Sequence, residues 1–171
     1  LYGTGDNYHA KESHVIASLL RKFINAKRNN IDHVNCWGSG LPLREFLHVD
    51  DLGYACVKAL EKWDPNSCCA PKDKFGNSLY YLNVGSSKEI SIKELAELIA
   101  RIINYKGQIN WDKSKPDGTF RKVLDTTRIN SIGWEPKITL EEGLKKTINE
   151  INQSLDKSND RGKSLKNFFK N

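Results

Sequence analysis

Apolar residues recur at intervals of three and four in several stretches of the chain, a spacing typical of amphipathic helices. The first predicted helix follows Ser13, its expected N-cap, and ends near Asn29. Its apolar face consists of Val15, Ile16, Leu19, Leu20, Phe23 and Ile24. Further helices are predicted over residues 51–62, 91–104, 126–132 and 139–154. The sequences SIKE and TLEE are capping boxes at the start of two of these helices.

Short apolar or alternating segments between these helices predict strands. The predicted strands span residues 32–37, 44–49, 79–86 and 108–111, and loops fill residues 63–77 and 112–122. Asp50 is expected to cap the helix over residues 51–62. That helix is expected to bury Leu52, Ala55, Cys56, Ala59 and Leu60. Because strands alternate with helices, the sequence predicts an α/β fold.

The charge balance of the chain is basic, with a formal net charge of +6 and a pI near 9.1. Part of this excess lies in residues 155–171, which are predicted to form a basic polar tail outside a globular unit of residues 1–154. A basic excess suits phosphate-bearing ligands. Nucleic acid is not an expected partner, because the sequence contains no recognition motif for it. No run of about 18 apolar residues is present, so no membrane-spanning helix and no membrane partner are expected.

The cysteines predict a reducing compartment. Cys36, Cys56, Cys68 and Cys69 form no CxxC pair and no metal-ligand spacing with histidine, so no metal site is predicted. With no secretory signal in view, reduced thiols in a cytoplasm are the expectation. A sequence that starts at Leu1 and contains no methionine is itself expected to be a fragment or a processed product.

The glycine-rich turn of a dinucleotide-binding domain is missing from the sequence. Gly3 and Gly5 are not followed by a suitable helix start. Tyr54 and Lys58 match the Tyr-x-x-x-Lys spacing of short-chain dehydrogenases. They lie about one turn apart on a predicted helix, a spacing that often arises by chance, and we expect no catalytic role for them.

A combination of longer motifs is more specific. The motifs are SHVI at residues 13–16, WGSG and REFLHVDD within residues 37–51, NVG at residues 83–85, and SKPDGT followed by RK within residues 114–122. Together they resemble the C-terminal half of the GDP-L-fucose synthases, which are extended short-chain dehydrogenases/reductases. The resemblance covers about residues 1–150 and implies the substrate-binding portion of such an enzyme, without its N-terminal Rossmann core. It implies NADPH-dependent 3,5-epimerisation and 4-reduction of GDP-4-keto-6-deoxy-D-mannose to GDP-L-fucose.

The resemblance also assigns roles to individual residues. His14 would be the acid of the epimerisation, which returns a proton to a carbon beside the keto group. Arg44 would bind the diphosphate, because its planar fork matches phosphate oxygens. Asp117 would contact the nucleotide, Trp37 would form a wall of the sugar and phosphate pocket, and Lys22 would contact the substrate.

Further contacts are implied with less support from the motifs. Leu1 and His14 would contact NADPH, and Arg121 and Lys122 would assist in substrate binding. The turn Gly38-Ser39-Gly40 would let the backbone approach the ligand closely. These expectations place the ligand beside the turn that links two predicted strands.

The family's glycine-rich loop, Ser-Tyr-Lys triad and epimerase cysteine would all precede Leu1. The chain alone is therefore expected to bind NADPH weakly and to be inactive, whereas the parent enzyme is expected to be a homodimer. Two alternatives remain open: a free-standing nucleotide-sugar-binding module, and a lobe of another nucleotide-sugar epimerase or dehydratase. His9 and His48 are weaker candidates for the acid, and His48 is expected to pack within a strand.

Overall fold

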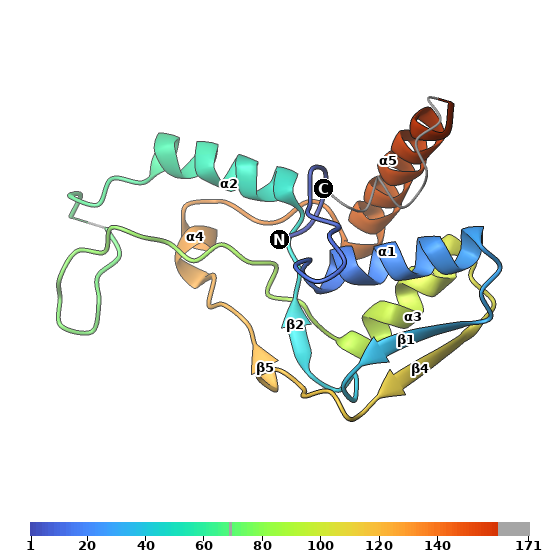
Figure 1. The fold of residues 1–171 in the computed structure, drawn as a ribbon. Coiled ribbons are helices and arrows are strands. Elements are labelled where there is room, and N and C mark those ends of the chain that lie inside the picture. Colours follow the sequence, from blue (N-terminus) through green and yellow to red (C-terminus); the bar gives the residue numbers. More distant parts are fainter. Residues whose placement is uncertain (69, 161–171) are drawn as a thin grey trace.

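The computed structural model describes residues 1–68 and 70–160 and has the α/β architecture that the sequence predicts (Figure 1). The helices are α1 (Val15–Arg28), α2 (Val49–Lys62), α3 (Ile92–Ile103), α4 (Thr127–Ser131) and α5 (Leu140–Asp160). The strands are β1 (His33–Trp37), β2 (Leu43–Glu45), β3 (Glu89–Ser91), β4 (Gln108–Asp112) and β5 (Arg121–Lys122).

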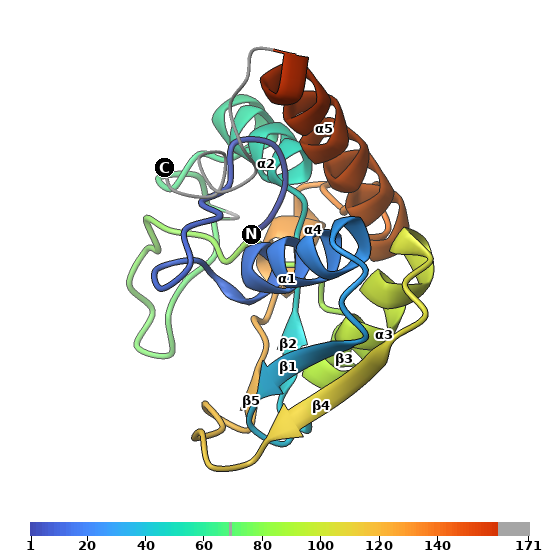
Figure 2. The same cartoon turned by 45° about the vertical axis from the view of Figure 1, so that its right-hand side comes forward.

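Strands β1 and β2 belong to two separate small sheets (Figure 2). β1 pairs in parallel with β4, and Trp37 lies opposite Asp112 at the end of this pair. β2 is the central strand of the other sheet, antiparallel to β3 and parallel to β5. Within that sheet Arg44 lies between Ile90 and Lys122. The two sheets thus carry the tryptophan and the arginine that the sequence singles out.

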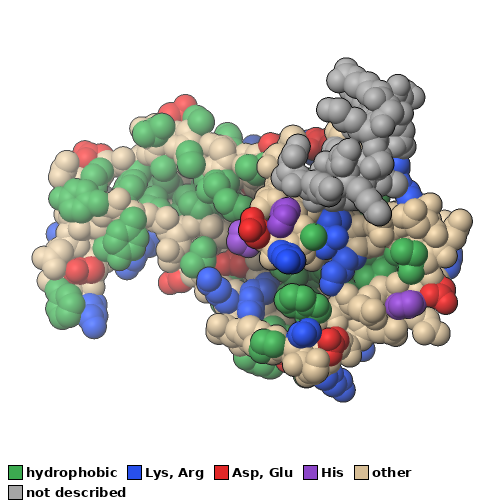
Figure 3. Space-filling view, viewed as in Figure 1, with side chains coloured by type: hydrophobic (Ala, Val, Ile, Leu, Met, Phe, Trp, Pro, Cys, Tyr) green, Lys and Arg blue, Asp and Glu red, His purple; other side chains and the backbone are tan. Residues whose placement is uncertain are grey.

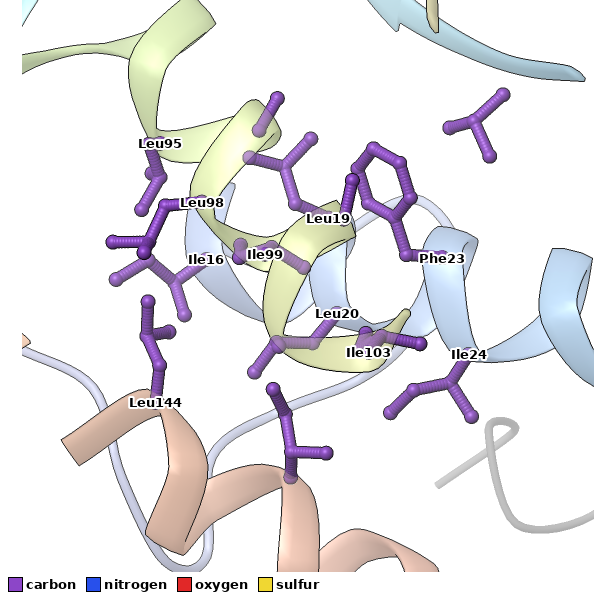
Figure 4. Close-up of a cluster of buried hydrophobic side chains, with 14 of the residues drawn as sticks. Ile16, Leu19, Leu20, Phe23, Ile24, Leu95, Leu98, Ile99, Ile103 and Leu144 are labelled. Carbon is purple, nitrogen blue, oxygen red and sulfur yellow. The ribbon is translucent and has the colours of Figure 1, made fainter. Parts of the chain in front are cut away.

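Helices α1, α3 and α5 pack together and bury the main core (Figure 4). The predicted apolar face of α1 is confirmed, since Leu20 and Phe23 are fully buried. Leu95 and Ile99 of α3 are fully buried in the same core. Leu144 of α5 is buried in the same core. Isolated helices of this length are marginal in water, so their stability comes mainly from this shared burial.

Both predicted capping boxes are formed. The amide of Glu94 donates to Ser91 Oγ at 3.1 Å, and the amide of Ser91 donates to the Glu94 carboxylate at 2.9 Å. An equivalent pair opens α5. The predicted cap at Ser13 is wrong, because α1 begins at Val15 and His14 occupies the N-cap position without a side-chain bond. Ser13 lies one residue too early to reach the free amides of the first turn.

The observed structure of the segment REFLHVDD, residues 44–51, differs from the predicted one. β2 ends at Glu45 and α2 already begins at Val49, so the strand predicted over residues 44–49 is too long. The partner strands β3 and β5 are equally short, with three and two residues. His48, rather than Asp50, caps α2, since its Nδ1 accepts a hydrogen bond from the Asp50 amide at 3.2 Å.

The segment 79–86 and the apolar face of α2 are only partly buried, although both were predicted to be buried. No strand of the described residues pairs with residues 79–86, and Tyr80 and Tyr81 are 70% and 65% exposed. On α2 only Ala55 of the predicted face is fully buried, whereas Leu60 is 88% exposed. Figure 3 shows hydrophobic side chains on the surface over α2. The predictions fail because no described element covers these faces.

Helix α5 is longer than predicted. It continues to Asp160, beyond the expected end at residue 154, and includes the first part of the predicted tail. Residues 161–171 of that tail lie outside the described residues. Among the residues that are described, no helix is long and apolar enough to span a membrane.

Candidate functional site

Trp37 is the last residue of β1, and 69% of its surface is exposed. The ammonium groups of Lys22 and Lys115 lie 5.8 and 5.9 Å from the centre of its ring, within the range of cation–π contacts. Lys22 reaches across from α1 and donates to the carbonyl oxygen of Asn35 at 2.8 Å. Burial lowers the pKa of Lys22, an effect that the neighbouring Cys36 partly opposes. The exposed ring and its two cations suit an anionic ligand with a flat or ring-shaped part.

The turn after Trp37 is tied to the loop that carries Asp117. Ser39 donates to the two oxygens of the Asp117 carboxylate, from its amide at 2.8 Å and from its hydroxyl at 2.6 Å. These hydrogen bonds lower the pKa of Asp117. Gly38 has a φ of +77°, and a Cβ there would collide with the same carboxylate. The turn and the loop therefore form one connected rim beside the tryptophan.

Arg44 and Lys122 lie opposite each other on β2 and β5. Side chains of residues in register point to the same face of a sheet, so the two cations share one face. The loop after Asp117 passes close to this pair, because a Cβ on Gly118 would lie 3.1 Å from Arg44 Nη2. The rim and the two cations are therefore neighbours.

Arg121 forms an ion pair with Glu89. Its guanidinium forms a bidentate ion pair with Glu89, with distances of 2.8 Å from Nε to Oε1 and 2.7 Å from Nη2 to Oε2. The hydrogen bond lowers the pKa of Glu89 and raises that of Arg121. For Arg44 and Lys122 no ion pair is found within residues 1–68 and 70–160. Of the two residues expected to assist in substrate binding, Arg121 is paired with Glu89, and the charge of Lys122 is available to a ligand.

His14 and Leu1 lie in a second place, near the start of α1. The His14 side chain is exposed, and Leu1 is 64% exposed. The amide of Tyr2 donates to the carbonyl oxygen of Leu47, and the carbonyl oxygen of Tyr2 accepts from the amide of Val49 at the start of α2. Both ribbon views place the N-terminus beside the first turn of α1 (Figures 1 and 2). In the part of the chain that the structure describes, no hydrogen bond joins His14 or Leu1 to Trp37 or Arg44.

The weaker candidates have structural contacts. His48 is 1% exposed and caps α2, so it serves the helix start rather than the predicted strand. His9 Nδ1 lies 3.8 Å from the Glu12 carboxylate. The ring of Tyr54 contacts the ammonium of Lys137, at 4.5 Å from the ring centre.

Comparison with known proteins identifies similar sequences. The NAD dependent epimerase/dehydratase family matches residues 1–68. GDP-L-fucose synthase 1 of Arabidopsis thaliana is 44% identical over 147 residues, which are 86% of this chain and 42% of that protein. GDP-L-fucose synthase of Escherichia coli strain K12 is 43% identical over 161 residues, which are 92% of this chain and 48% of that protein. The chain matches the GDP-L-fucose synthases. It spans a little under half the length of these relatives.

Solved structures agree with the fold. A GDP-L-fucose synthetase from Naegleria fowleri bound to NADP superposes with a TM-score of 0.75 at 23% identity, over 91% of this chain and 45% of that one. A GDP-mannoheptose C4 reductase from Campylobacter jejuni with NADP bound gives a TM-score of 0.72 at 27% identity, over 88% of this chain and 50% of that one. The resemblance to GDP-L-fucose synthases and the α/β class are both confirmed.

Three residues near the site were missed by sequence reasoning. Ser39 was predicted only as part of a flexible turn, yet it holds Asp117. Lys115 is the second cation beside Trp37. Glu45 binds two distant backbone amides. All three residues lie inside the quoted motifs, and that position was the only signal in the sequence that could have found them.

Proposed function

We propose that this chain is the substrate-binding portion of an enzyme that converts GDP-4-keto-6-deoxy-D-mannose to GDP-L-fucose. The reaction would combine 3,5-epimerisation with NADPH-dependent 4-reduction. The observation that carries the proposal is the cation pair Arg44 and Lys122 beside the rim of Trp37, Ser39 and Asp117. Similarity to GDP-L-fucose synthases over 86–92% of the chain supports a GDP-sugar as the substrate class.

Each part of this site suits one part of a nucleotide sugar. The Arg44 fork can donate two parallel hydrogen bonds to the diphosphate, and Lys122 adds a point charge. Trp37 would line the sugar and phosphate pocket, with Lys22 as a further contact. Asp117 would bind the nucleotide, because each carboxylate oxygen that accepts a bond from Ser39 keeps capacity for another donor.

His14 is the proposed acid of the epimerisation. Its exposed imidazole is not engaged as a helix cap, so it is free to protonate a substrate carbon. Carbons 3 and 5 of the substrate flank the ketone, which makes their hydrogens acidic. The base of this step would come from outside the chain.

NADPH would supply the hydride that reduces carbon 4. Leu1 and His14 are exposed and suit contact with an edge of that cofactor. In the described residues, however, Gly3 and Gly5 lie in a turn that no helix follows until Val15, so no phosphate-binding turn of the Rossmann kind is formed. We therefore expect the chain alone to bind NADPH weakly and to be inactive.

The rest of the enzyme would cover the exposed faces of α2 and residues 79–86. In this proposal residues 1–154 are the substrate-binding lobe, and α2 and residues 79–86 join the Rossmann part. Because α5 continues to Asp160, residues 155–160 would belong to this lobe, and the basic tail would begin after them. The parent enzyme would be a cytoplasmic homodimer. Free thiols at Cys36 and Cys56 support a reducing compartment.

Titration with GDP and UDP, followed by tryptophan fluorescence, tests the proposal. The chain should bind GDP, and Arg44→Gln should weaken binding about 10- to 100-fold through loss of charge-assisted hydrogen bonds. Arg101→Gln is a matched control, because Arg101 is an exposed arginine on α3 away from the site, and it should leave binding unchanged. Equal affinity for GDP and UDP would favour another nucleotide-sugar enzyme, and failure to bind GDP would contradict the proposal.

A further inference from the structure

Glu45 ends β2, directly after Arg44, and its carboxylate binds two backbone amides from distant parts of the chain. The amide of Ser87 donates to Oε2 at 2.8 Å, and the amide of Leu124 donates to Oε1 at 2.6 Å. These amides lie 42 and 79 residues away in the sequence. One side chain therefore joins the end of β2 to the segment before β3 and to the segment after β5.

The chain around Gly85 is shaped to admit this carboxylate. A Cβ on Gly85 would lie 2.6 to 2.9 Å from the carboxyl atoms of Glu45, which is closer than real contacts allow. Ser87 has a φ of 54°, a left-handed conformation that a residue with a Cβ keeps only when its surroundings hold it. Glu45 holds its amide, and a 2.6 Å hydrogen bond with the Thr126 hydroxyl holds its side chain. The glycine of the NVG motif is explained by the position of Glu45.

The same carboxylate extends the pairing of β2 with β5. That parallel ladder contains only two residue pairs, one of which is Arg44 with Lys122. A ladder this short specifies its own register weakly. The hydrogen bond from Leu124 to Glu45 follows Lys122 by two residues and continues the contact between the two strands. This hydrogen bond fixes the position of Lys122 relative to Arg44.

We propose that Glu45 is a positioning residue for the phosphate-binding pair Arg44 and Lys122. This inference rests on the proposed function. Successive side chains of a strand point to opposite faces, so Glu45 acts through the backbone from the face away from Arg44. In that place its negative charge does not face the diphosphate, and its two hydrogen bonds keep the pair of cations on one face at a fixed spacing.

The test compares Glu45→Gln with Asp51→Asn. A glutamine keeps the size of Glu45 but offers one oxygen to two amides. Asp51 is a matched control, because its buried carboxylate also accepts two backbone hydrogen bonds, from Lys137 at 3.1 Å and Ile138 at 2.9 Å, away from Arg44. Both variants should lower the melting temperature of the chain.

Affinities for GDP and guanosine separate positioning from general stability. Glu45→Gln should weaken GDP binding by about tenfold and leave guanosine binding unchanged, because guanosine has no phosphate. Asp51→Asn should keep the GDP-to-guanosine affinity ratio of the unmodified chain. A normal ratio in Glu45→Gln would overturn the inference, and so would an equal fall of the ratio in both variants.

Failure of the unmodified chain to bind GDP would overturn the proposed function instead. Hydrogen exchange at the amides of Ser87 and Leu124 then still tests Glu45. Both amides should exchange faster in Glu45→Gln than in Asp51→Asn. Unchanged exchange would overturn the inference independently of any ligand.

Discussion

Helices α1 and α2 have the same length, 14 residues each, but opposite surroundings. α1 buries seven of its residues against α3, α5 and β1, whereas α2 buries only Asp51 and Ala55. The core beneath α2 is small and consists of Leu47, Ala55, Ile129 and Trp134. Tyr54, Val57 and Leu60 of α2 are exposed.

This contrast shows what amphipathic spacing can and cannot predict. The spacing indicates that a helix has an apolar face, but it does not identify the element that covers it. The partners of α1 lie in the described residues. No described element covers the outer face of α2, and the chain spans less than half the length of its relatives. We propose that the rest of the enzyme covers it.

The largest contrast between the two regions should come from one leucine in each. Leu95→Ala should lower the free energy of unfolding by about 3 to 4 kcal/mol, because it leaves a cavity in the main core. Leu60→Ala should change it by less than about 0.5 kcal/mol, because Leu60 is 88% exposed. Urea titration of both variants measures the difference. A large loss in Leu60→Ala would show that the face of α2 is covered in solution.

Thiol reactivity should distinguish the same regions. Cys36 is buried in the main core, and burial raises its pKa, so little thiolate is present and access requires opening. Cys56 is exposed on α2. We expect Cys56 to react with iodoacetamide at least about 100-fold faster, as followed by mass spectrometry. Similar rates in the folded chain would contradict this, and equal rates in denaturant serve as the control.

Two glycines should respond in opposite directions. Gly85→Ala should lower the free energy of unfolding by about 1 to 3 kcal/mol, because its Cβ would press on Glu45. Gly53→Ala should raise it by about 0.5 to 1 kcal/mol, because Gly53 is inside α2 with open space around it. Thermal unfolding measures both. Destabilisation by Gly53→Ala would mean that this face of α2 has a close neighbour.

The smallest expected effect is the response of the rim to acid. Hydrogen bonds from Ser39 depress the pKa of Asp117 below its ordinary value of 3.8. The stabilisation they give is complete above that value and is lost as the pH falls through the lower pKa of the folded state. The amide signal of Ser39, followed by NMR from about pH 6 to 2, should titrate below 3.8. Ser39→Ala should move the midpoint upward, and a wild-type midpoint at or above 3.8 would contradict the contact.

The failed predictions have a common cause. The capping boxes were predicted correctly because all their partners lie within four residues. In REFLHVDD the choice between His48 and Asp50 as cap depends on how the chain enters α2, which the residue types do not specify. The sequence of residues 79–86 predicts a buried strand. A strand also requires a partner edge, which the sequence of the segment cannot supply.

The sequence by itself determined the helices, strands β1 and β4, the α/β class and the resemblance to GDP-L-fucose synthases, because these depend on residues close together in the chain. Only the tertiary structure decided that Ser39 holds Asp117, 78 residues away, and that Lys122 rather than Arg121 stands beside Arg44. The last choice follows from strand register, since a shift of one residue would turn the other cation toward Arg44. Register between distant short strands is set by contacts such as those of Glu45, and no local pattern in the sequence encodes it.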